Sequence, residues 1–373
     1  MSNNDWWYHN PTSPIQIAKE FAKDHKVLFV NSISFGMPSQ KERDFFAKLT
    51  RKVKSYITFF RKVGTSLHVL SPVSIPSFSN PGIVALNKLI LQWQIELGLR
   101  MAGLEHPICI VANPMFQSGG VPSNCFKLIY FVTDKYDSKK LPNKEAVIEA
   151  DRKMAKRADV IVCVSHALFK YYNGMYGKTK VITHGVNYEH FSRANENTLN
   201  WPDDMKDLRK PIVGFMGAID AKTVDPDLLV YLLKKNSKKT FIFVGNLSNN
   251  ISYLNEYENA YFLGQKHFNE LPRYLSKFDV ALMPFNNSEW IRYCNPIKLK
   301  EYLAAGLPVV SINIKEAEPY GDIMYLASNY EEFNKLLNIA IKEDSIQLRR
   351  DRQERMSGET WAEKVNQLKE LIN

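Results

Sequence analysis

Short apolar, β-branched segments alternate with helix-patterned segments along most of the chain, and the alternation starts afresh near residue 211. Strands that alternate with helices form parallel sheets through right-handed crossovers, so the pattern predicts a doubly wound α/β fold. The expected strands cover 26–31, 66–70, 107–112, 127–132, 160–164, 180–183, 211–216, 240–244, 260–262, 280–283 and 308–311. The expected helices include 13–23, 84–101, 144–157, 226–234, 271–277, 297–305 and 330–342.

The length of 373 residues exceeds what one hydrophobic core usually serves, which favours two domains. A polar, irregular stretch over 193–210 separates the two runs of alternation. We expect Rossmann-like domains over 1–185 and 186–355, facing each other across a ligand-binding cleft, and a helix over 356–373 that packs back toward the first domain. The first clear strand follows a helix, so we expect the usual opening strand to be very short or missing from the N-terminus.

The composition narrows the class of partner. The net charge is +10, from 49 basic and 39 acidic residues, which points to nucleic acid, a phosphate-bearing substrate or a membrane surface. The four cysteines form no C-x-x-C pair, which argues against a disulfide framework or a zinc site and fits a cytoplasmic protein. No apolar run approaches the roughly 18 residues needed to span a bilayer.

The segment 290–311 carries the clearest chemical signal. Asn295 is expected to cap a helix, with Pro296 in its first turn and Gly306 at its end. A helix N-terminus with free amides, a positive dipole and the nearby Lys298 is a natural phosphate site. Glu301, one turn further on, could accept hydrogen bonds from a ribose. The alternative is an ordinary capped helix with a surface lysine–glutamate pair.

The run N-P-I-K-L-K-E-Y-L-A-A-G-L-P-V-V-S over 295–311 resembles the donor-site motif of family 4-like GT-B glycosyltransferases. It is most similar to the subgroup that builds bacterial surface polysaccharides of the teichuronic-acid type. Further stretches agree in the same order, at 130–137, 158–169, 184–191, 213–220 and 263–285. The resemblance implies a GT-B fold, a nucleotide diphosphate sugar as donor, and catalysis without a metal or other cofactor, because a helix dipole and basic side chains would stabilise the leaving diphosphate.

The resemblance also implies a set of donor-site residues. The backbone of Pro296, Ile297 and Lys298 would hold the diphosphate, and the Lys298 charge would stabilise it as it leaves. Glu301 would bind the ribose hydroxyls. The other donor-side candidates are Asn295, Gly217, His267 in a loop that borders the base, Arg292, Tyr293 and His184.

Two departures from the family pattern leave the sugar and the stereochemical outcome open, although the resemblance favours retention. Tyr293 stands eight positions before Glu301, where relatives carry the acid that touches the sugar. Ala218 follows Gly217 where an arginine usually faces the phosphates. The candidate substitutes for that arginine are Lys222, Arg292 and Lys298.

Asp134 follows the strand 127–132 at its carboxyl end, where ligand sites of α/β proteins lie. It could orient the sugar or acceptor, or act as the base of an inverting mechanism; the alternative is an aspartate that caps a turn. His184 ends the last strand of the first domain and is expected to face the hinge. It is either a donor contact or a structural loop histidine.

Eight basic residues over 41–62 alternate with apolar ones at helical spacing. This pattern indicates an amphipathic cationic helix, which either docks on an anionic membrane or packs on the core with a solvated basic face. Asp225-Pro226-Asp227 looks like a metal-binding D-x-D motif but fits a helix cap and first turn better.

The leading hypothesis is a glycosyltransferase that works at the inner face of the plasma membrane, as a cytoplasmic or peripheral protein. It would transfer a sugar to a hydroxyl of a lipid-linked glycan in surface polysaccharide synthesis. The alternatives are a GT-B-fold nucleotide-sugar epimerase and a basic nucleic-acid-binding protein, although the basic stretch carries no recognised nucleic-acid motif.

Overall fold

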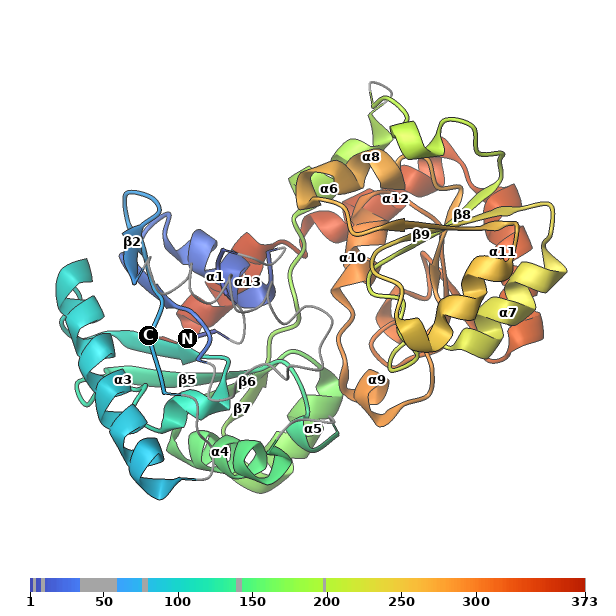
Figure 1. The fold of residues 1–373 in the computed structure, drawn as a ribbon. Helices are drawn as coiled ribbons and strands as arrows, with labels where there is room; N and C mark the ends of the chain where they lie inside the picture. The colour runs from blue at the N-terminus through green and yellow to red at the C-terminus, as the bar shows by residue number, and fades with distance from the viewer. Residues whose placement is uncertain are drawn as a thin grey trace. The chain divides into compact units, whose positions relative to one another are not determined.

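The chain forms two compact units, which are described separately (Figure 1). The computed structural model describes residues 1–2, 5–7, 11–33, 59–75, 80–138, 143–196 and 199–372. Unit 1 comprises Met1–Thr183 and Lys364–Asn373, and unit 2 comprises His184–Glu363. Within the described residues, no helix has both the length and the apolar composition that a bilayer crossing requires.

The described residues of unit 1 form two small sheets. The first has the order β1-β3-β2, with β1 (Val27–Val30) parallel to β3 (Leu67–Leu70) and β2 (Phe60–Lys62) antiparallel to β3. The second is parallel throughout, in the order β4 (Ile108–Val111), β5 (Lys127–Val132), β6 (Val160–Cys163) and β7 (Thr179–Val181). Its helices are α1 (Ser13–Phe21), α3 (Pro81–Ala102), α4 (Lys144–Arg157), α5 (His166–Tyr176) and, from Lys364 onward, α13 (Trp361–Glu370).

The end of the basic stretch 41–62 differs from the expected helix. Residues 60–62 form β2, and Phe60 stacks on His68 of β3 with ring centroids 5.2 Å apart. A cross-strand aromatic pair stabilises an antiparallel ladder, so these three residues are extended rather than helical. Residues 41–58 lie outside the described part of the chain, and membrane docking stays a prediction.

Unit 2 is built on one six-stranded parallel sheet in the order β10-β9-β8-β11-β12-β13. The strands are β8 (Ile212–Met216), β9 (Thr240–Val244), β10 (Ala260–Gly264), β11 (Val280–Met283), β12 (Val309–Ile312) and β13 (Tyr325–Ala327). The helices are α6 (Tyr188–Ser192), α7 (Pro226–Lys235), α8 (Leu271–Leu275), α9 (Glu289–Tyr293), α10 (Ile297–Ala304), α11 (Tyr330–Glu343) and α12 (Ile346–Ser357). Sequence periodicity missed β13, because three residues are too few to show it.

The sheet of unit 2 buries apolar side chains on both faces. Ile212 and Met216 of β8 pack with residues of α6, α8, α10 and α12, whereas Val213 and Phe215 pack with residues of α7 and α11. Figure 1 shows α7 and α11 side by side, and they contact each other. Because successive side chains of a strand point to opposite faces, a run apolar at every position needs a cover on each side.

Helix α7 settles the role of the Asp225-Pro226-Asp227 segment. The Asp225 carboxylate accepts hydrogen bonds from the amides of Asp227 and Leu228, each at 3.1 Å. Pro226 is the first helical residue. The segment is therefore a helix cap and first turn, as predicted, because its first carboxylate is committed to backbone amides.

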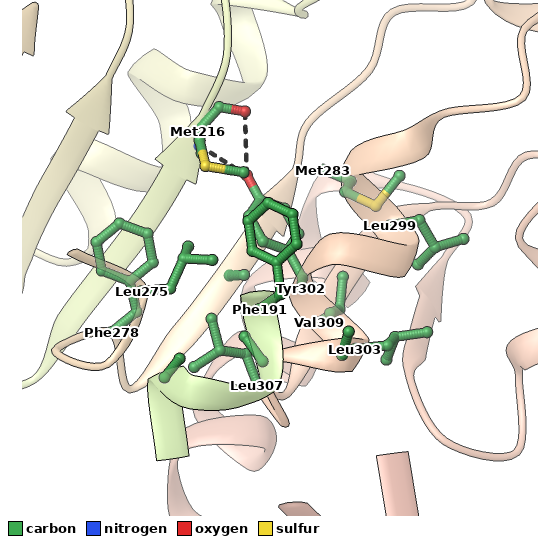
Figure 2. Close-up of a cluster of buried hydrophobic side chains, with 14 of the residues drawn as sticks. Phe191, Met216, Leu275, Phe278, Met283, Leu299, Tyr302, Leu303, Leu307 and Val309 are labelled. Atoms are coloured by element: carbon green, nitrogen blue, oxygen red, sulfur yellow. Dashed lines mark hydrogen bonds between the residues drawn. The ribbon is translucent and has the colours of Figure 1, made fainter. Parts of the chain in front are cut away.

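Tyr302 attaches helix α10 to the end of β8. The Met216 amide donates to the Tyr302 hydroxyl at 2.6 Å, and that hydroxyl donates to the Met216 carbonyl at 3.3 Å. Figure 2 shows the Tyr302 ring among Phe191, Leu299, Leu303 and other apolar side chains of this face of the sheet. The buried hydroxyl therefore fixes the position of α10 along β8.

Lys300 fixes the other side of α10. This lysine is almost fully buried. Its ammonium donates to the His184 carbonyl and forms an ion pair with Glu359 at 2.8 Å. A buried lysine needs such partners, so Lys300 has a structural role.

Replacement of Tyr302 by phenylalanine is expected to destabilise unit 2 by about 1–3 kcal/mol, because the buried Met216 amide loses its acceptor. Chemical denaturation of the purified protein, followed by tryptophan fluorescence, measures the change. Tyr325→Phe is the matched control, since the Tyr325 hydroxyl bonds an exposed Glu343 carboxylate at 3.5 Å. Equal effects of the two substitutions would show that the Tyr302 hydroxyl does not hold α10.

Candidate active site

The side of the sheet to which the chain adds successive strands changes between β8 and β11 in unit 2. From β8 the chain builds outward through β9 and β10, and it then returns to the other side of β8 with β11, β12 and β13. Open parallel sheets bind ligands outside the carboxyl ends of their strands at such a reversal. The topology thus places the expected site of unit 2 beyond Met216 and Met283, the last residues of β8 and β11.

Two glycines follow the neighbouring strands β8 and β9 at this edge. Gly217 has φ 137° and Gly245 has φ 149°, backbone conformations that favour glycine. The Gly217 amide donates to the Val244 carbonyl at 2.8 Å, and a Cβ on Gly245 would lie 1.9 Å from the Gly217 oxygen. Because neither position carries a side chain, the backbone at the edge stays open to a ligand.

The Lys298 ammonium lies at the reversal point. A Cβ on Gly217 would come within 2.5 Å of the Lys298 nitrogen, so the amine rests directly on this glycine. The same nitrogen lies 4.5 Å from the ring centroid of Phe215 in β8 and 5.5 Å from that of Phe285 just after β11. Cation–π contacts with both rings stabilise the charge where the topology predicts a ligand.

Burial shifts the pKa values of both charged groups on this part of α10. It lowers the pKa of the Lys298 amine to about 8, against the opposing effect of Cys294 and Glu301. It raises the pKa of the Glu301 carboxyl to about 7, although the Lys298 charge partly compensates. Both side chains remain half-exposed, so a ligand can reach them. Titratable groups with shifted pKa values, located where the fold binds ligands, are typical of functional sites.

The start of α10 presents amides without a side-chain cap. The cap position is Pro296, which has no side-chain acceptor, and the first turn contains no acidic residue. The amides of Ile297 and Lys298 open the helix and carry the positive end of its dipole. This arrangement suits an anion, and the Lys298 ammonium adds to it.

The expected capping role of Asn295 is wrong. Its side chain is buried and donates to the Glu316 carboxylate at 2.8 Å. The helix starts at Ile297, as the pattern predicts, but Pro296 is its cap residue and does not lie in its first turn. Asn295 supports the segment that leads into the helix.

The other sequence candidates of unit 2 are more dispersed. The His267 ring accepts from the Asn269 amide at 3.4 Å and starts a short 3-10 helix. Arg292 is exposed on α9 and donates to Asn287 at 3.2 Å, and Tyr293, the last residue of α9, is half-exposed. The His184 ring lies 6.2 Å from that of Trp361, and its carbonyl accepts from Lys300 on α10. His184 therefore reaches α10 through its backbone.

Asp134 belongs to unit 1, where it follows β5 by two residues. Its carboxylate accepts from the Thr133 hydroxyl at 3.0 Å and remains half-exposed. The position at the carboxyl edge of the four-stranded sheet agrees with the sequence expectation. A role in catalysis stays a prediction.

Sequence reasoning missed the aromatic partners of Lys298 and the partner of Asn295. Phe215 and Phe285 appear in the sequence as ordinary strand and post-strand hydrophobes, and Glu316 follows an unremarkable loop. Their roles come from long-range packing. A signal was present only for Phe285, which follows β11 at the edge where ligands bind.

The comparisons with known proteins agree with the resemblance seen in the motifs. Residues 210–338 match the family model described as Glycosyl transferases group 1. The Bacillus subtilis (strain 168) protein TuaH, whose name assigns it to teichuronic acid biosynthesis as a glycosyltransferase, is 31% identical over 191 residues. The match covers 48% of this chain and 47% of TuaH. An uncharacterized 41.2 kDa protein in the cps region of Klebsiella pneumoniae is 28% identical, over 58% of each chain. The chain thus spans about half the length of these curated relatives.

Solved structures confirm the GT-B fold. Sucrose-phosphate synthase from Thermosynechococcus elongatus has a TM-score of 0.69 at 14% identity, covering 96% of this chain and 91% of its own. The Anabaena protein HepE in complex with UDP has a TM-score of 0.66 at 15% identity, covering 97% and 96%. An Escherichia coli structure described as trehalose-6-phosphate bound with UDP-2-fluoro glucose has a TM-score of 0.69 at 12% identity, covering 100% and 97%.

The lowered pKa of Lys298 predicts unusual amine reactivity. In competitive acetylation across a pH series, half-maximal labelling of Lys298 is expected near pH 8, because burial disfavours its charged form. An ordinary lysine titrates near about 10.4. Peptide mass spectrometry measures the labelling, with the exposed Lys315 as internal reference. Parallel pH profiles for the two lysines would contradict the assigned environment.

Proposed function

We propose that this chain, whose residues 210–338 match the glycosyl transferases group 1 model, is a glycosyltransferase that binds a nucleotide diphosphate sugar in unit 2. The sugar passes to a hydroxyl of a glycan acceptor in surface polysaccharide synthesis. The observation that carries the proposal is the Lys298 ammonium, resting on Gly217 at the start of α10 and at the reversal point of the sheet. Amides and a cation converge there on a position suited to a diphosphate.

The chemistry follows from charge. A departing nucleoside diphosphate gains negative charge as the bond to the sugar breaks. The helix dipole and the Lys298 ammonium are already positioned to stabilise that negative charge. The protein therefore supplies the stabilisation from its own groups. Glu301, one turn further along α10, is positioned to accept hydrogen bonds from ribose hydroxyls. We propose a reaction that needs no metal and that retains the sugar configuration.

The relatives support the substrate classes. TuaH is named for teichuronic acid biosynthesis, which favours a surface polysaccharide as product. The Anabaena and Escherichia coli structures hold UDP and a UDP sugar analogue on the same fold, which favours a nucleotide sugar as donor. A lipid-linked acceptor at the inner membrane face fits the net charge of +10.

Loss of the Lys298 ammonium or the Glu301 carboxylate is expected to weaken nucleoside diphosphate binding by about 10- to 100-fold, as for a lost hydrogen bond to a charged group. Calorimetric titration with UDP, GDP, ADP, CDP and dTDP identifies the base and measures Lys298→Ala and Glu301→Ala. Lys315→Ala and Glu318→Ala are matched controls, because this exposed pair has the same residue types and the same spacing in unit 2. Binding that is unchanged in all four variants would refute the site.

Incubation with the matching nucleotide sugar then tests the reaction. Release of nucleoside diphosphate that depends on added lipid-linked glycan, and persists in EDTA, supports metal-independent transfer. An epimerised nucleotide sugar, formed without acceptor, would instead identify an isomerase.

Binding of the nucleoside diphosphate is expected to be tightest between about pH 7 and pH 8. Above about 8 the Lys298 amine loses the charge that attracts phosphate, and below about 7 the Glu301 carboxyl becomes protonated and accepts ribose hydroxyls less well. Lys298→Arg keeps its charge, so its alkaline decline should begin at higher pH. A pH-independent affinity from 6 to about 9 would argue against both groups as ligands.

A further inference from the structure

The carboxamide of Asn295 has one end that is hydrogen bonded and one end that is not. Asn295 lies in the short connection between α9 and α10 (Figure 1) and is only 7% exposed. Its nitrogen donates to the Glu316 carboxylate at 2.8 Å. Among the described residues of unit 2, its oxygen is the one buried side-chain nitrogen or oxygen atom that has no hydrogen-bond partner. A buried acceptor without a partner costs free energy, so it requires an explanation, and a ligand group is one.

Glu316 determines the direction of the Asn295 carboxamide. A carboxylate has only acceptor oxygens, so it binds the nitrogen end of an amide and repels the oxygen end. Glu316 is itself buried, in the loop that follows β12. A half-turn of the amide would bring two acceptors together in the interior, where the repulsion is strong. The Asn295 oxygen is therefore held pointing away from Glu316.

An amide oxygen can bind only a group that donates a hydrogen bond. The diphosphate of a nucleotide sugar presents acceptor oxygens, so it gains nothing from the Asn295 oxygen. The groups on either side of the diphosphate are different, because the ribose and the transferred sugar both carry hydroxyls that can donate. The chemistry of the carboxamide thus restricts its partner to one of these two sugars.

The order of the site residues along the chain favours the transferred sugar. The diphosphate is proposed at 296–298, where α10 begins, and the ribose at Glu301, one turn further along the helix. Asn295 directly precedes the diphosphate segment, so it lies on the other side of that segment from Glu301. A nucleotide diphosphate sugar has the same order, with the ribose on one side of the diphosphate and the transferred sugar on the other. Asn295 therefore corresponds to the sugar end of the donor.

We infer that the Asn295 oxygen accepts a hydrogen bond from a hydroxyl of the transferred sugar, and that Glu316 is the positioning residue that holds it in the accepting orientation. The inference rests on the proposed function, because it requires a nucleotide sugar at the start of α10. Since the oxygen is buried, the hydroxyl reaches it through a local shift of residues 293–295, of which Tyr293 and Cys294 are half-exposed. The donor sugar consequently has a free hydroxyl at this position, and a sugar without it binds more weakly.

Two affinities separate a sugar contact from a supporting role. Calorimetry without acceptor measures the Kd of the nucleoside diphosphate selected in the panel above, and the Kd of its glucose, galactose, N-acetylglucosamine and glucuronate conjugates. Asn295→Ala should raise the Kd of the best conjugate by about 3- to 10-fold, as for one lost hydrogen bond, and leave that of the bare diphosphate within about 2-fold. Equal changes in both affinities, or no change in either, would overturn the inference.

Asn236→Ala is the matched control. Asn236 is an equally buried asparagine of unit 2, at the end of α7. Its nitrogen donates to the Leu232 carbonyl at 2.9 Å, and its oxygen accepts from Lys239 at 2.6 Å, so both ends of this amide are hydrogen bonded within the protein. Its loss should lower stability and leave the ratio of the two Kd values unchanged.

Glu316→Gln tests the positioning role. A glutamine amide can donate as well as accept, so it no longer fixes the direction of the Asn295 carboxamide. The Kd of the conjugate should rise by about 2-fold or more, with that of the bare diphosphate unchanged. Asn295→Asp places two carboxylates in contact, and adding Glu316→Gln to it restores a hydrogen bond between the two positions and keeps an acceptor at 295. The double variant should therefore bind the conjugate more tightly than Asn295→Asp alone, and failure of this rescue would contradict the assigned orientation.

Deoxy-sugar conjugates identify the hydroxyl. In the wild type, removal of one hydroxyl should raise the Kd by about 3- to 10-fold, and the same removal should have no effect in Asn295→Ala, because both changes delete one hydrogen bond. If Asn295→Ala does not fold, Glu316→Gln takes its place and should show a reduced effect of the same hydroxyl. Additive losses at every hydroxyl would overturn the inference. A wild type that binds no nucleoside diphosphate would instead refute the proposed function, so the two failures are distinguishable.

Discussion

The hydrogen bonds between the Tyr302 hydroxyl and the Met216 backbone set the geometry on which the candidate site depends. They tie the middle of α10 to the last residue of β8, so the start of the helix must lie at the carboxyl edge of the sheet. That position brings the Lys298 amine onto Gly217, the residue directly after β8. A shift of α10 by one turn, about 5.4 Å, would remove the ammonium from the reversal point. The buried Tyr302 hydroxyl therefore determines, through the position of α10, where the Lys298 ammonium lies in the candidate site.

Two lysines of α10, Lys298 and Lys300, differ in their surroundings and therefore in the roles that we assign to them. Lys300 is buried against Glu359 and the His184 carbonyl, so its charge is balanced within the unit. Lys298 points to the open edge and contacts the faces of Phe215 and Phe285, which stabilise a cation without neutralising it. The positive charge at the start of the helix thus comes from Lys298. The helix dipole has the same sign there, and the two act together on an anion.

Much of the fold follows from local signals in the sequence. The strands 127–132, 240–244 and 280–283 were predicted to the residue, because each is a continuous apolar run between turn signals. The short strands β2 and β13 were not predicted. Three residues are too few to show a hydrophobic periodicity, and their extended conformation depends on the strands with which they pair. The phosphate-binding role proposed for 296–298 rests on capping logic and family resemblance. Capping logic failed at Asn295, where a contact with Glu316, 21 residues away, decides the side chain's direction.

The pKa values at the site link ligand binding to proton uptake. A lysine with a pKa near 8 is only partly protonated in mildly alkaline solution. A diphosphate placed beside it favours the charged form, so binding raises the pKa of Lys298 and draws a proton from solvent. By reciprocity, protonation of Lys298 strengthens the hold on the diphosphate. In the proposed transfer the diphosphate gains charge as it leaves the sugar, and its interaction with Lys298 would become stronger at that step than in the bound donor. Interactions that grow along the reaction coordinate are the ones that accelerate it.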